Sequence, residues 1–295
     1  MPFRTDLAME GAETHRENLP KGVVMDEYSF GGLNIHNVKI TDAAAGEIIG
    51  KPVGEYTTVT TPPFYGPTEM EEEEIGAIAK EISAMLPQSG LVLVVGLGNN
   101  DITPDAVGPR TVHQVLATRH ISGEIASQTG FDALRPTAAI APGVLGQTGI
   151  ETSEIIRSIV QDIQPSAVIV IDALAARSAA RLGNTIQISN SGISPGSGVM
   201  NSRKELSKRT LGVPVISIGI PTVVDAATLA GDLLDCDEKN LDKRRRLFEP
   251  QGQAMMITPR EIDTLIGRAC KTLSLAINKA LQPAMTLEEL GYLVS

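Results

Sequence analysis

The sequence lacks tryptophan, and aromatic residues of all kinds make up only 3% of its 295 residues. Aliphatic side chains must therefore fill the protein interior, and a hydrophobic content of 42% is enough for a sizeable core. A chain of this length fits one large domain, or one domain that carries an insertion.

Cysteine is also scarce, because Cys236 and Cys270 are the only two in the chain. Neither belongs to a Cys-x-x-Cys pair, so the sequence supports neither a zinc site nor a disulfide framework. A reducing, cytoplasmic compartment is the expected environment. No apolar run reaches the ~18–20 residues of a membrane span, and residues 1–6 lack the apolar stretch of a secretory signal. We therefore expect no membrane partner.

The chain has little positive charge and few histidines. Its formal net charge is −10, which argues against direct nucleic-acid binding. The basic run Lys243–Arg246 falls within residues 235–253, which we expect to form an exposed, mobile insertion. His113 and His120 lie seven residues apart, which is not the i, i+4 spacing of a zinc protease, and no histidine follows His120.

The patterning that is present predicts an α/β fold with a mostly parallel or mixed sheet flanked by helices. Residues 1–20 are polar and predict an arm without a core of its own. Short alternating patches at 22–24, 33–40 and 56–61 predict an extra N-terminal β region, antiparallel and at a sheet edge. The further strands expected are Leu91–Val95, Thr137–Ile140, Ala167–Ile171, Thr185–Ser189 and Val213–Ile220. The helices expected are Glu71–Leu86, Asp105–Arg119, Glu151–Ile163, Leu174–Arg181, Thr222–Leu234 and Thr258–Leu281, the last with a capping box at 258–261.

Two aspartates follow buried strands of this expected sheet. Asp105 comes after Leu91–Val95, and Asp172 directly follows Ala167–Ile171. Ligands of open α/β sheets bind outside the carboxyl ends of the strands, so both carboxylates are candidates for one site. Two carboxylates in one apolar cleft push their pKa values apart and supply one acid and one base. Taken singly, each also suits a helix cap.

The glycines after the first strand, in Gly96–Asn99, invite a dinucleotide-binding interpretation. The fingerprint needs a third glycine at the helix start, but Asp101 stands there. Asp101 and Asp105 would also repel a pyrophosphate. The alternative is that the glycines only allow a tight turn between strand and helix.

A second motif, Gly192–Gly196, matches the Gly-x-Ser-x-Gly string of serine hydrolases. Pro195 has no N–H for an oxyanion hole, and no histidine follows the serine, so a serine triad is not supported. The segment instead predicts a loop that holds the substrate backbone or stabilises the oxyanion, and Arg177 predicts a charge-stabilising residue or a surface salt bridge. The loop candidates are Ser191, Ser194, Gly196 and Ser197.

These motifs closely resemble the spore germination protease family, which degrades small acid-soluble spore proteins. The resemblance extends over nearly the whole chain. It implies a homotetrameric endopeptidase of atypical aspartic type, without a cofactor, made as a zymogen and active in the core of the germinating spore. The family's two essential aspartates fall on Asp105 and Asp172. The segments that carry the resemblance are Val94–Pro109, Pro142–Ser153, Ile171–Ser178, Ser191–Val199 and Gly219–Ala226.

The fold that this resemblance implies, a phosphorylase/hydrolase-like one, is also similar to that of hydrogenase maturation proteases. Those relatives recognise substrate with a bound nickel, and they have a Glu in the place of Asp105, an Asp in that of Asp172 and a later His. No histidine follows His120 here. The sequence therefore favours acid–base chemistry without a metal.

The N-terminus contains a possible copy of the family's cleavage site. Germination proteases cut after Glu in a Thr-Glu-(bulky apolar)-Ala sequence, and Thr5–Glu10 matches this with Asp6 for Glu. We predict self-cleavage between Asp6 and Leu7, which removes residues 1–6 as a propeptide and leaves 7–295 as a single peptidase domain. The alternative is a disordered arm, as termini often are.

Two other functions remain open from the sequence. One is a metal-dependent peptidase of the maturation type, with Asp105 and Asp172 as ligands. The other is a non-catalytic module that holds a spore protein or a nucleotide in the same cleft. Glu151 and Asp225 are weaker candidates, which line the cleft or cap helices.

Overall fold

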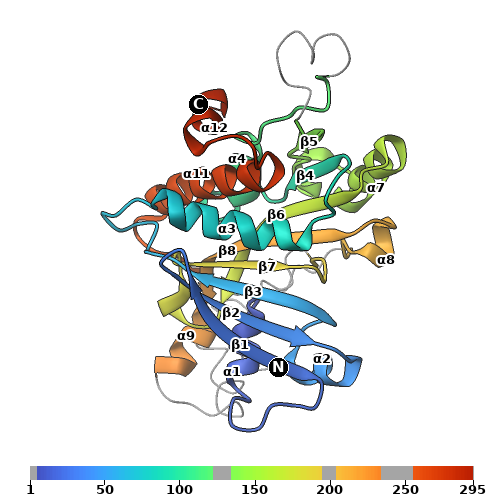
Figure 1. Cartoon of the computed structure of the whole chain (residues 1–295). Coiled ribbons are helices and arrows are strands. Elements are labelled where there is room, and N and C mark those ends of the chain that lie inside the picture. The colour runs from blue at the N-terminus through green and yellow to red at the C-terminus, as the bar shows by residue number, and fades with distance from the viewer. Residues whose placement is uncertain (1–4, 122–133, 195–203, 234–254, 295) are drawn as a thin grey trace.

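The computed structural model describes residues 5–121, 134–194, 204–233 and 255–294. Nine strands in this part of the chain form one sheet, in the order β1-β2-β3-β7-β8-β6-β4-β5, with β9 paired to β8 (Figure 1). The strands are β1 (Val23–Phe30), β2 (Leu33–Ile40), β3 (Gly54–Thr60), β4 (Val92–Gly96), β5 (Thr137–Ile140), β6 (Ala167–Ala176), β7 (Thr185–Ser189), β8 (Val215–Asp225) and β9 (Met256–Ile257).

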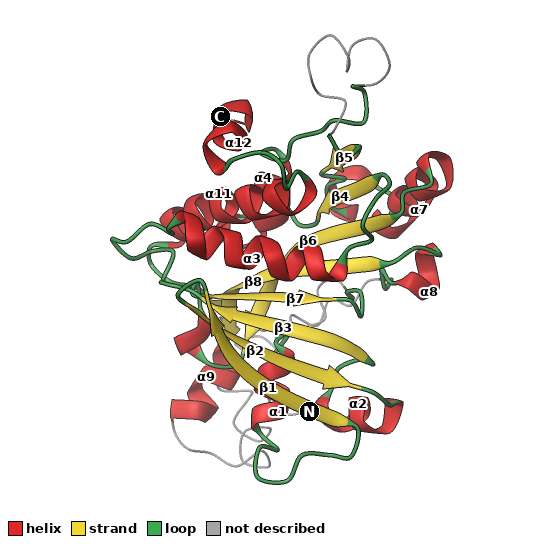
Figure 2. Cartoon of the chain, in the orientation of Figure 1, coloured by secondary structure: helices red, strands yellow, loops and turns green. Residues whose placement is uncertain are grey.

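Helices flank this sheet on both faces (Figure 2). None of those in the described ranges is long and apolar enough to cross a membrane. The α-helices are α1 (Ala8–Glu13), α2 (Ala43–Ile49), α3 (Glu72–Met85), α4 (Val107–Val112), α6 (Leu145–Thr148), α7 (Thr152–Ile163), α8 (Lys208–Leu211), α9 (Ala226–Leu233), α11 (Ile262–Leu281) and α12 (Leu287–Val294). Two 3-10 turns, η1 (Thr103–Asp105) and η2 (Ala179–Arg181), complete the list.

The sheet is mixed, as the sequence predicts. Strands β5, β4, β6 and β8 run parallel to one another. From β8 outward through β7, β3 and β2 to β1, each pair is antiparallel, so the N-terminal hairpins form an edge region. The expected α/β class and the extra β region are confirmed.

Both faces of the parallel half are buried, because the apolar side chains alternate between two layers of helices. Val94 and Ile169 pack with residues of α3 and α11, which lie in front of the sheet in Figure 1. Val95 and Val170 point the other way and pack with Ile156 of α7. Burial on two faces explains the near-continuous apolar runs of these strands.

The N-terminal arm differs from the expectation, because residues 5–13 pack on the folded protein. Leu7 is fully buried, and Ala8 and Ala12 of α1 join a core cluster with Val38 and Tyr56 of the edge region. The apolar residues within this otherwise polar segment therefore have a core to join, and the disordered-arm alternative is wrong for residues 5–13.

The helix expected at Leu174–Arg181 is not formed, because β6 continues as far as Ala176. Residues 174–176 pair with β8, and Ala175 also exchanges hydrogen bonds with Asp6 of the arm. These pairings override the helix propensity of the Leu-Ala-Ala sequence. Only the single turn η2 follows.

Strand β8 likewise runs through Pro221 to Asp225, where the sequence predicts a strand end and a helix from Thr222. The β6–β8 register shifts between Leu174 and Ala175, opposite this proline, which has no N–H for the ladder. Helix α9 then begins at Ala226. The Asp225 carboxylate accepts hydrogen bonds from the Thr228 N–H and hydroxyl, both at 2.9 Å, and so caps that helix.

Two other helices are shorter than predicted. The expected helix Asp105–Arg119 is formed only as α4, because Asn278 of α11 accepts from the Leu116 N–H and donates to the Gln114 carbonyl. Helix α11 starts at Ile262, and the expected capping box is absent: the Thr258 hydroxyl instead donates to the Thr222 carbonyl. The insertion expected at 235–253 lies outside the described residues.

Candidate active site

The structure brings Asp105 and Asp172 to one cavity at the carboxyl ends of β4 and β6. The cavity has a volume of about 360 Å³. Asp172 is 6% exposed and Asp105 is half-buried. The remaining wall is mainly apolar and includes Leu97, Pro104, Val144, Leu174 and Val223.

Asp172 is positioned by strand β6 itself. It continues the alternation of Val168 and Val170, so it projects from the face of the sheet that α7 covers. Its Oδ1 accepts a hydrogen bond from the Ala173 N–H at 2.9 Å. Since no helix starts at Leu174, the helix-cap interpretation of this aspartate is wrong.

Asp105 is held by the turn that follows β4. It is the last residue of η1, and its Oδ2 accepts from the Asn99 N–H at 2.7 Å. The buried Thr222 hydroxyl of β8 donates to the Pro104 carbonyl at 2.8 Å, which ties this turn to the sheet. The N-cap of α4 is Ala106, without a side-chain cap bond, so Asp105 is not its cap.

The glycines of this region serve close packing within the chain. Gly98 has φ +111°, and a Cβ there would lie 2.0 Å from the Asp105 carbonyl oxygen. A Cβ on Gly108 would lie 2.2 Å from the Leu97 carbonyl oxygen and 2.5 Å from that of Ile171. Backbone atoms of the chain itself lie against these glycines, which agrees with the tight-turn interpretation.

A second cavity, of about 220 Å³, adjoins the first, because Asp6, Asp172 and Leu174 line both. It also contains Ser191 and Ser194 of the predicted substrate loop. The Ser191 hydroxyl lies 2.9 Å from the Ser189 hydroxyl. The other two loop candidates, Gly196 and Ser197, lie outside the described residues.

The N-terminal segment lies across both cavities. The Asp6 N–H donates to the Ala175 carbonyl at 2.7 Å, and an Asp6 carboxylate oxygen accepts from the Ala175 N–H at 2.9 Å. Gln187 Nε2 donates to the Asp6 carbonyl at 3.0 Å, and Lys51 Nζ donates to the Thr5 carbonyl at 3.1 Å. Residues 5 and 6 are thus bound through the backbone N–H and carbonyl groups of the segment and through the Asp6 carboxylate.

Leu7 fills an apolar pocket beyond Asp6. It is fully buried among Leu174, Ala176, Leu182 and Val224. Burying a leucine side chain in this way stabilises the docked segment by roughly 1.5–3 kcal/mol.

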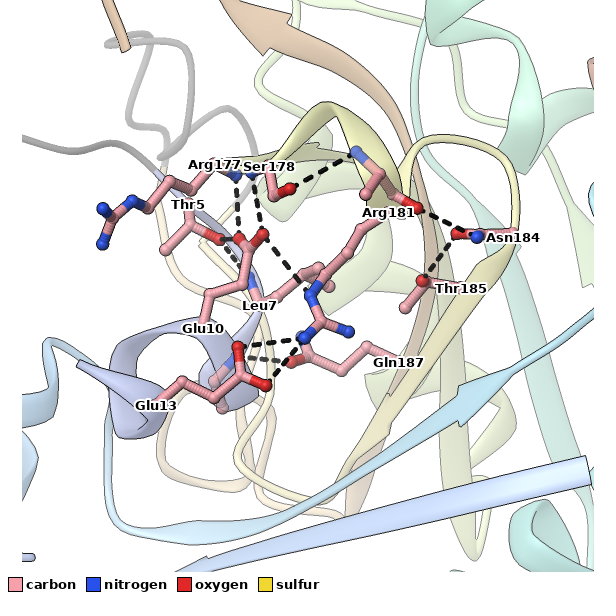
Figure 3. A network of polar contacts seen from close by, with 12 residues as sticks. Thr5, Leu7, Glu10, Glu13, Arg177, Ser178, Arg181, Asn184, Thr185 and Gln187 are labelled. Atoms are coloured by element: carbon pink, nitrogen blue, oxygen red, sulfur yellow. Dashed lines mark hydrogen bonds and ion pairs between the residues drawn. The ribbon is translucent and has the colours of Figure 1, made fainter. Parts of the chain in front are cut away.

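Glu10 anchors the following helix (Figure 3). Its buried carboxylate accepts from the backbone N–H groups of Arg177 and Ser178, at 2.8 and 2.9 Å, and from the Thr5 hydroxyl. Arg181 lies 3.6 Å from the same carboxylate and binds both oxygens of Glu13 at 2.8 and 2.9 Å. These charge-assisted contacts hold α1 next to the end of β6.

Two titratable groups of the second cavity are perturbed. Burial lowers the pKa of Lys51, while the negative charges of Asp6 and Glu10 oppose this shift. Burial raises the pKa of Tyr56 to about 12. The cavity wall therefore favours the neutral forms of these side chains, and the carboxylates of the N-terminal segment favour a charged Lys51.

Comparison with known proteins decides the family. The family model described as germination protease matches residues 4–247. The chain belongs to the germination protease family. It is 43% identical to the germination protease of Caldanaerobacter subterraneus subsp. tengcongensis, over 99% of this chain and 98% of that one. The Clostridium perfringens protein is 42% identical over 98% of both chains, and that of Priestia megaterium 38% over 98% and 96%.

Among solved structures, the chain is similar to a [NiFe] hydrogenase maturation protease, HycI from Thermococcus kodakarensis KOD1. The identity is 12% and the TM-score 0.37, over 67% of this chain and 98% of that one. Within the described ranges, no three His, Cys, Asp or Glu side chains are grouped so as to hold a metal ion.

Arg177 of this germination protease lies apart from the two aspartates. It follows β6 directly and lines a separate hollow with Glu13, Arg181 and Asn184. Its backbone N–H binds Glu10, while its guanidinium points away from Glu10 in Figure 3. The alternative role of Arg177 was a salt bridge on the surface of the helix expected at Leu174–Arg181, and that helix is not formed.

The sequence did not point to four residues that hold the N-terminal segment in place: Glu10 of the segment itself, and Lys51, Arg181 and Gln187, which contact it. One signal was available for Gln187, since a long polar side chain stands between Ile186 and Ile188 in a strand that is buried throughout. Such a residue needs a polar partner in the interior. The other three lie in segments whose patterns carry no sign of their distant partners.

Proposed function

We propose that this germination protease is an endopeptidase that begins the degradation of small acid-soluble spore proteins in the core of the germinating spore. It cuts after Glu and before a bulky apolar residue, and it is made as a zymogen that cleaves itself between Asp6 and Leu7. Residues 1–6 are then the propeptide and 7–295 the peptidase domain. The observation that supports this proposal is that Asp6, held by hydrogen bonds to Ala175, lines the same cavity as Asp105 and Asp172.

The aspartate pair supplies general acid–base catalysis. The ionised member of Asp105 and Asp172 takes a proton from water, and the water oxygen attacks the carbonyl carbon before the cut. The protonated member then gives its proton to the amide nitrogen as the C–N bond breaks. One proton enters the pair and one leaves, so the pair is reset, and it titrates as a unit rather than as two separate groups.

The contacts of the docked segment support the expected cleavage specificity. The Asp6 carboxylate accepts the Ala175 N–H and lies within the electrostatic reach of Lys51, which suits an acidic residue before the cut. The pocket around Leu7 suits a bulky apolar residue after it. A substrate Glu has one methylene more than Asp6 with which to reach the same groups.

The test is to incubate the purified full-length protein with a small acid-soluble spore protein, with and without a chelator, and to read the products by intact mass. The proposal expects loss of residues 1–6 and substrate cleavage after Glu, both unaffected by the chelator. Cleavage that needs a divalent metal would make Asp105 and Asp172 metal ligands instead. Stoichiometric retention of intact substrate would indicate a binding module.

The same assay with Asp105→Asn and Asp172→Asn tests the mechanism. Each variant should lose both self-cleavage and substrate cleavage, because each removes one proton-transfer group. Full activity of both variants would refute the aspartate pair, and full activity of the uncut parent would refute the zymogen. Light scattering of the parent tests the homotetramer expected for the family.

A further inference from the structure

We propose that Gln187 is a further catalytic residue: its side-chain amide donates a hydrogen bond to the carbonyl oxygen of the bond to be cut and stabilises the negative charge that develops there. This inference rests on the proposed function, because it takes the Asp6–Leu7 bond as the site of cleavage. It assigns the oxyanion-stabilising role to β7, where the sequence pointed to the loop after that strand.

Gln187 binds the backbone on both sides of the Asp6–Leu7 bond. Its Nε2 lies 3.0 Å from the Asp6 carbonyl oxygen, and its Oε1 lies 2.7 Å from the Ala8 nitrogen. The Ala8 N–H can only donate, so the amide oxygen faces Ala8 and the NH₂ group faces the carbonyl. The side chain, 8% exposed, therefore directs a donor at the reacting oxygen from a site with little water.

The sheet register places Gln187 opposite Asp172. Gln187 of β7 is the register partner of Gly219 in β8, and Gly219 is in turn the partner of Asp172 in β6. Register partners project to the same face, so Gln187 and Asp172 stand on one face, two strand spacings or about 10 Å apart. A peptide held between them meets an acid–base group on one side and a hydrogen-bond donor on the other.

Gly219 makes room for the Leu174 side chain, which packs over the strand between these two residues. A Cβ there would lie 2.5 Å from Leu174 Cγ and would crowd the floor of the cavity that Gln187, Gly219 and Asp172 line together. The carboxylate and the carboxamide thus face each other across the sheet, with Leu174 packed over the glycine between them. A neutral amide suits this position, because it stabilises an oxyanion without adding a charge next to the aspartate pair.

The test compares two substitutions that separate positioning from charge stabilisation. Gln187→Glu is isosteric and keeps an oxygen for the Ala8 N–H, but an ionised carboxylate offers the Asp6 carbonyl no donor. Gln187→Met removes both bonds at similar size. Gln161→Met, at an exposed position of α7, is the matched control. Each is made in the full-length chain, and the first-order rate of self-cleavage is followed by intact mass.

Loss of one oxyanion donor typically lowers kcat by about 10²–10³-fold. We expect a loss of that size in Gln187→Glu and Gln187→Met for self-cleavage and for kcat on a spore protein, with KM changed only a few-fold. Because a protonated carboxyl regains a donor, the rate of Gln187→Glu relative to Gln187→Met should rise as the pH falls. A Gln187→Glu rate within three-fold of the parent, or a ratio that does not change with pH, would overturn the inference.

Asp105→Asn and Asp172→Asn, measured in parallel, keep the two proposals apart. If the aspartate variants are inactive while Gln187→Glu cleaves normally, only the role of Gln187 fails. If both aspartate variants cleave at the parental rate, the proposed mechanism itself fails. Thermal unfolding of each variant identifies any that is inactive because it is unfolded, and Gln187→Met then replaces Gln187→Glu in the comparison of rates.

Discussion

At the scale of single residues, the polar groups around the docked segment have little contact with water. Tyr56 is 3% exposed, and its hydroxyl donates to the Pro52 carbonyl at 2.7 Å. Lys51 is half-buried and depends on the carboxylates of Asp6 and Glu10 to favour its charged form. The binding of the N-terminal segment is therefore linked to the charges of its carboxylates and of Lys51.

Tyr56 should make the protein lose stability at high pH. Its pKa is about 12 in the folded state against 10.0 ordinarily, so the unfolded chain releases this proton first as the pH rises. The stabilisation is complete below pH 10 and is lost between about pH 10 and 12, roughly 3 kcal/mol in all. Urea unfolding from pH 8 to 12 should show a smaller loss in Tyr56→Phe. A constant difference between parent and variant over that range would contradict this assignment.

The Asp6 carboxylate should control the rate of self-cleavage. Asp6→Asn replaces a charged acceptor of the Ala175 N–H with a neutral one and removes a charge that opposes the burial of Lys51. A charge-assisted hydrogen bond contributes about 1.5–3 kcal/mol, so cleavage should slow by about 10- to 100-fold, whereas Asp6→Glu should cleave readily. Intact mass over time gives these rates, and Asp162→Asn on the exposed face of α7 is the control. Equal rates of self-cleavage with Asn and with Asp at position 6 would show that the protein has no preference for an acidic residue before the cut.

At the scale of elements, apolar patterning predicted the central strands and the long helices, because burial on two faces dictates their sequences. It failed where tertiary hydrogen bonds decide the backbone. Residues 174–176 extend β6 because β8 and Asp6 pair with them. The helix after Asp105 is short because Asn278 binds the later backbone groups of that segment. Those partners are 40 or more residues away along the chain, beyond the range of local periodicity.

The contact between α4 and the sheet should depend on Gly108. A Cβ there would meet backbone atoms of Leu97 and Ile171, which have no freedom to rotate away. Gly108→Ala should therefore destabilise the protein by about 1–3 kcal/mol, as overpacking does. It should also slow self-cleavage, since α4 follows Asp105 by two residues.

Gly76→Ala in helix α3 is the matched substitution, because its Cβ would have no neighbour within 4 Å. Alanine has the higher helix propensity, so this variant should be more stable than the parent by up to about 1 kcal/mol. Urea unfolding of both variants measures the contrast. Equal stability of the two would mean that α4 moves away from β4 and β6 without loss.

At the scale of the whole molecule, the N-terminal segment lies at the candidate site although it is distant from it in sequence. Asp6 pairs with Ala175, 169 residues away, and Gln187 binds it across 181 residues. The candidate aspartates were predicted from their place after buried strands, and the cleavage motif from the family resemblance, because each is a short local pattern. The docking that brings them together was not, because a pairing of that separation leaves no periodic trace in either segment.

Residues 5 and 6 should compete with other peptides for the site that holds the acidic residue before the cut. Removal of residues 1–6 leaves α1 tied through Glu10 and Glu13 to Arg181, but it frees Lys51, Gln187 and Ala175 from their contacts with Thr5 and Asp6. A peptide with the sequence of residues 1–6 should then bind a chain that starts at Leu7, and the full-length chain should bind it at least 10-fold more weakly. Both proteins carry Asp105→Asn so that no cleavage occurs, and fluorescence anisotropy measures the affinities.

The same peptide with Asn in place of Asp6 should bind the shortened chain more weakly, because it lacks the carboxylate. Equal affinity of the first peptide for the full-length and shortened chains would show that residues 5 and 6 do not occupy the site in solution.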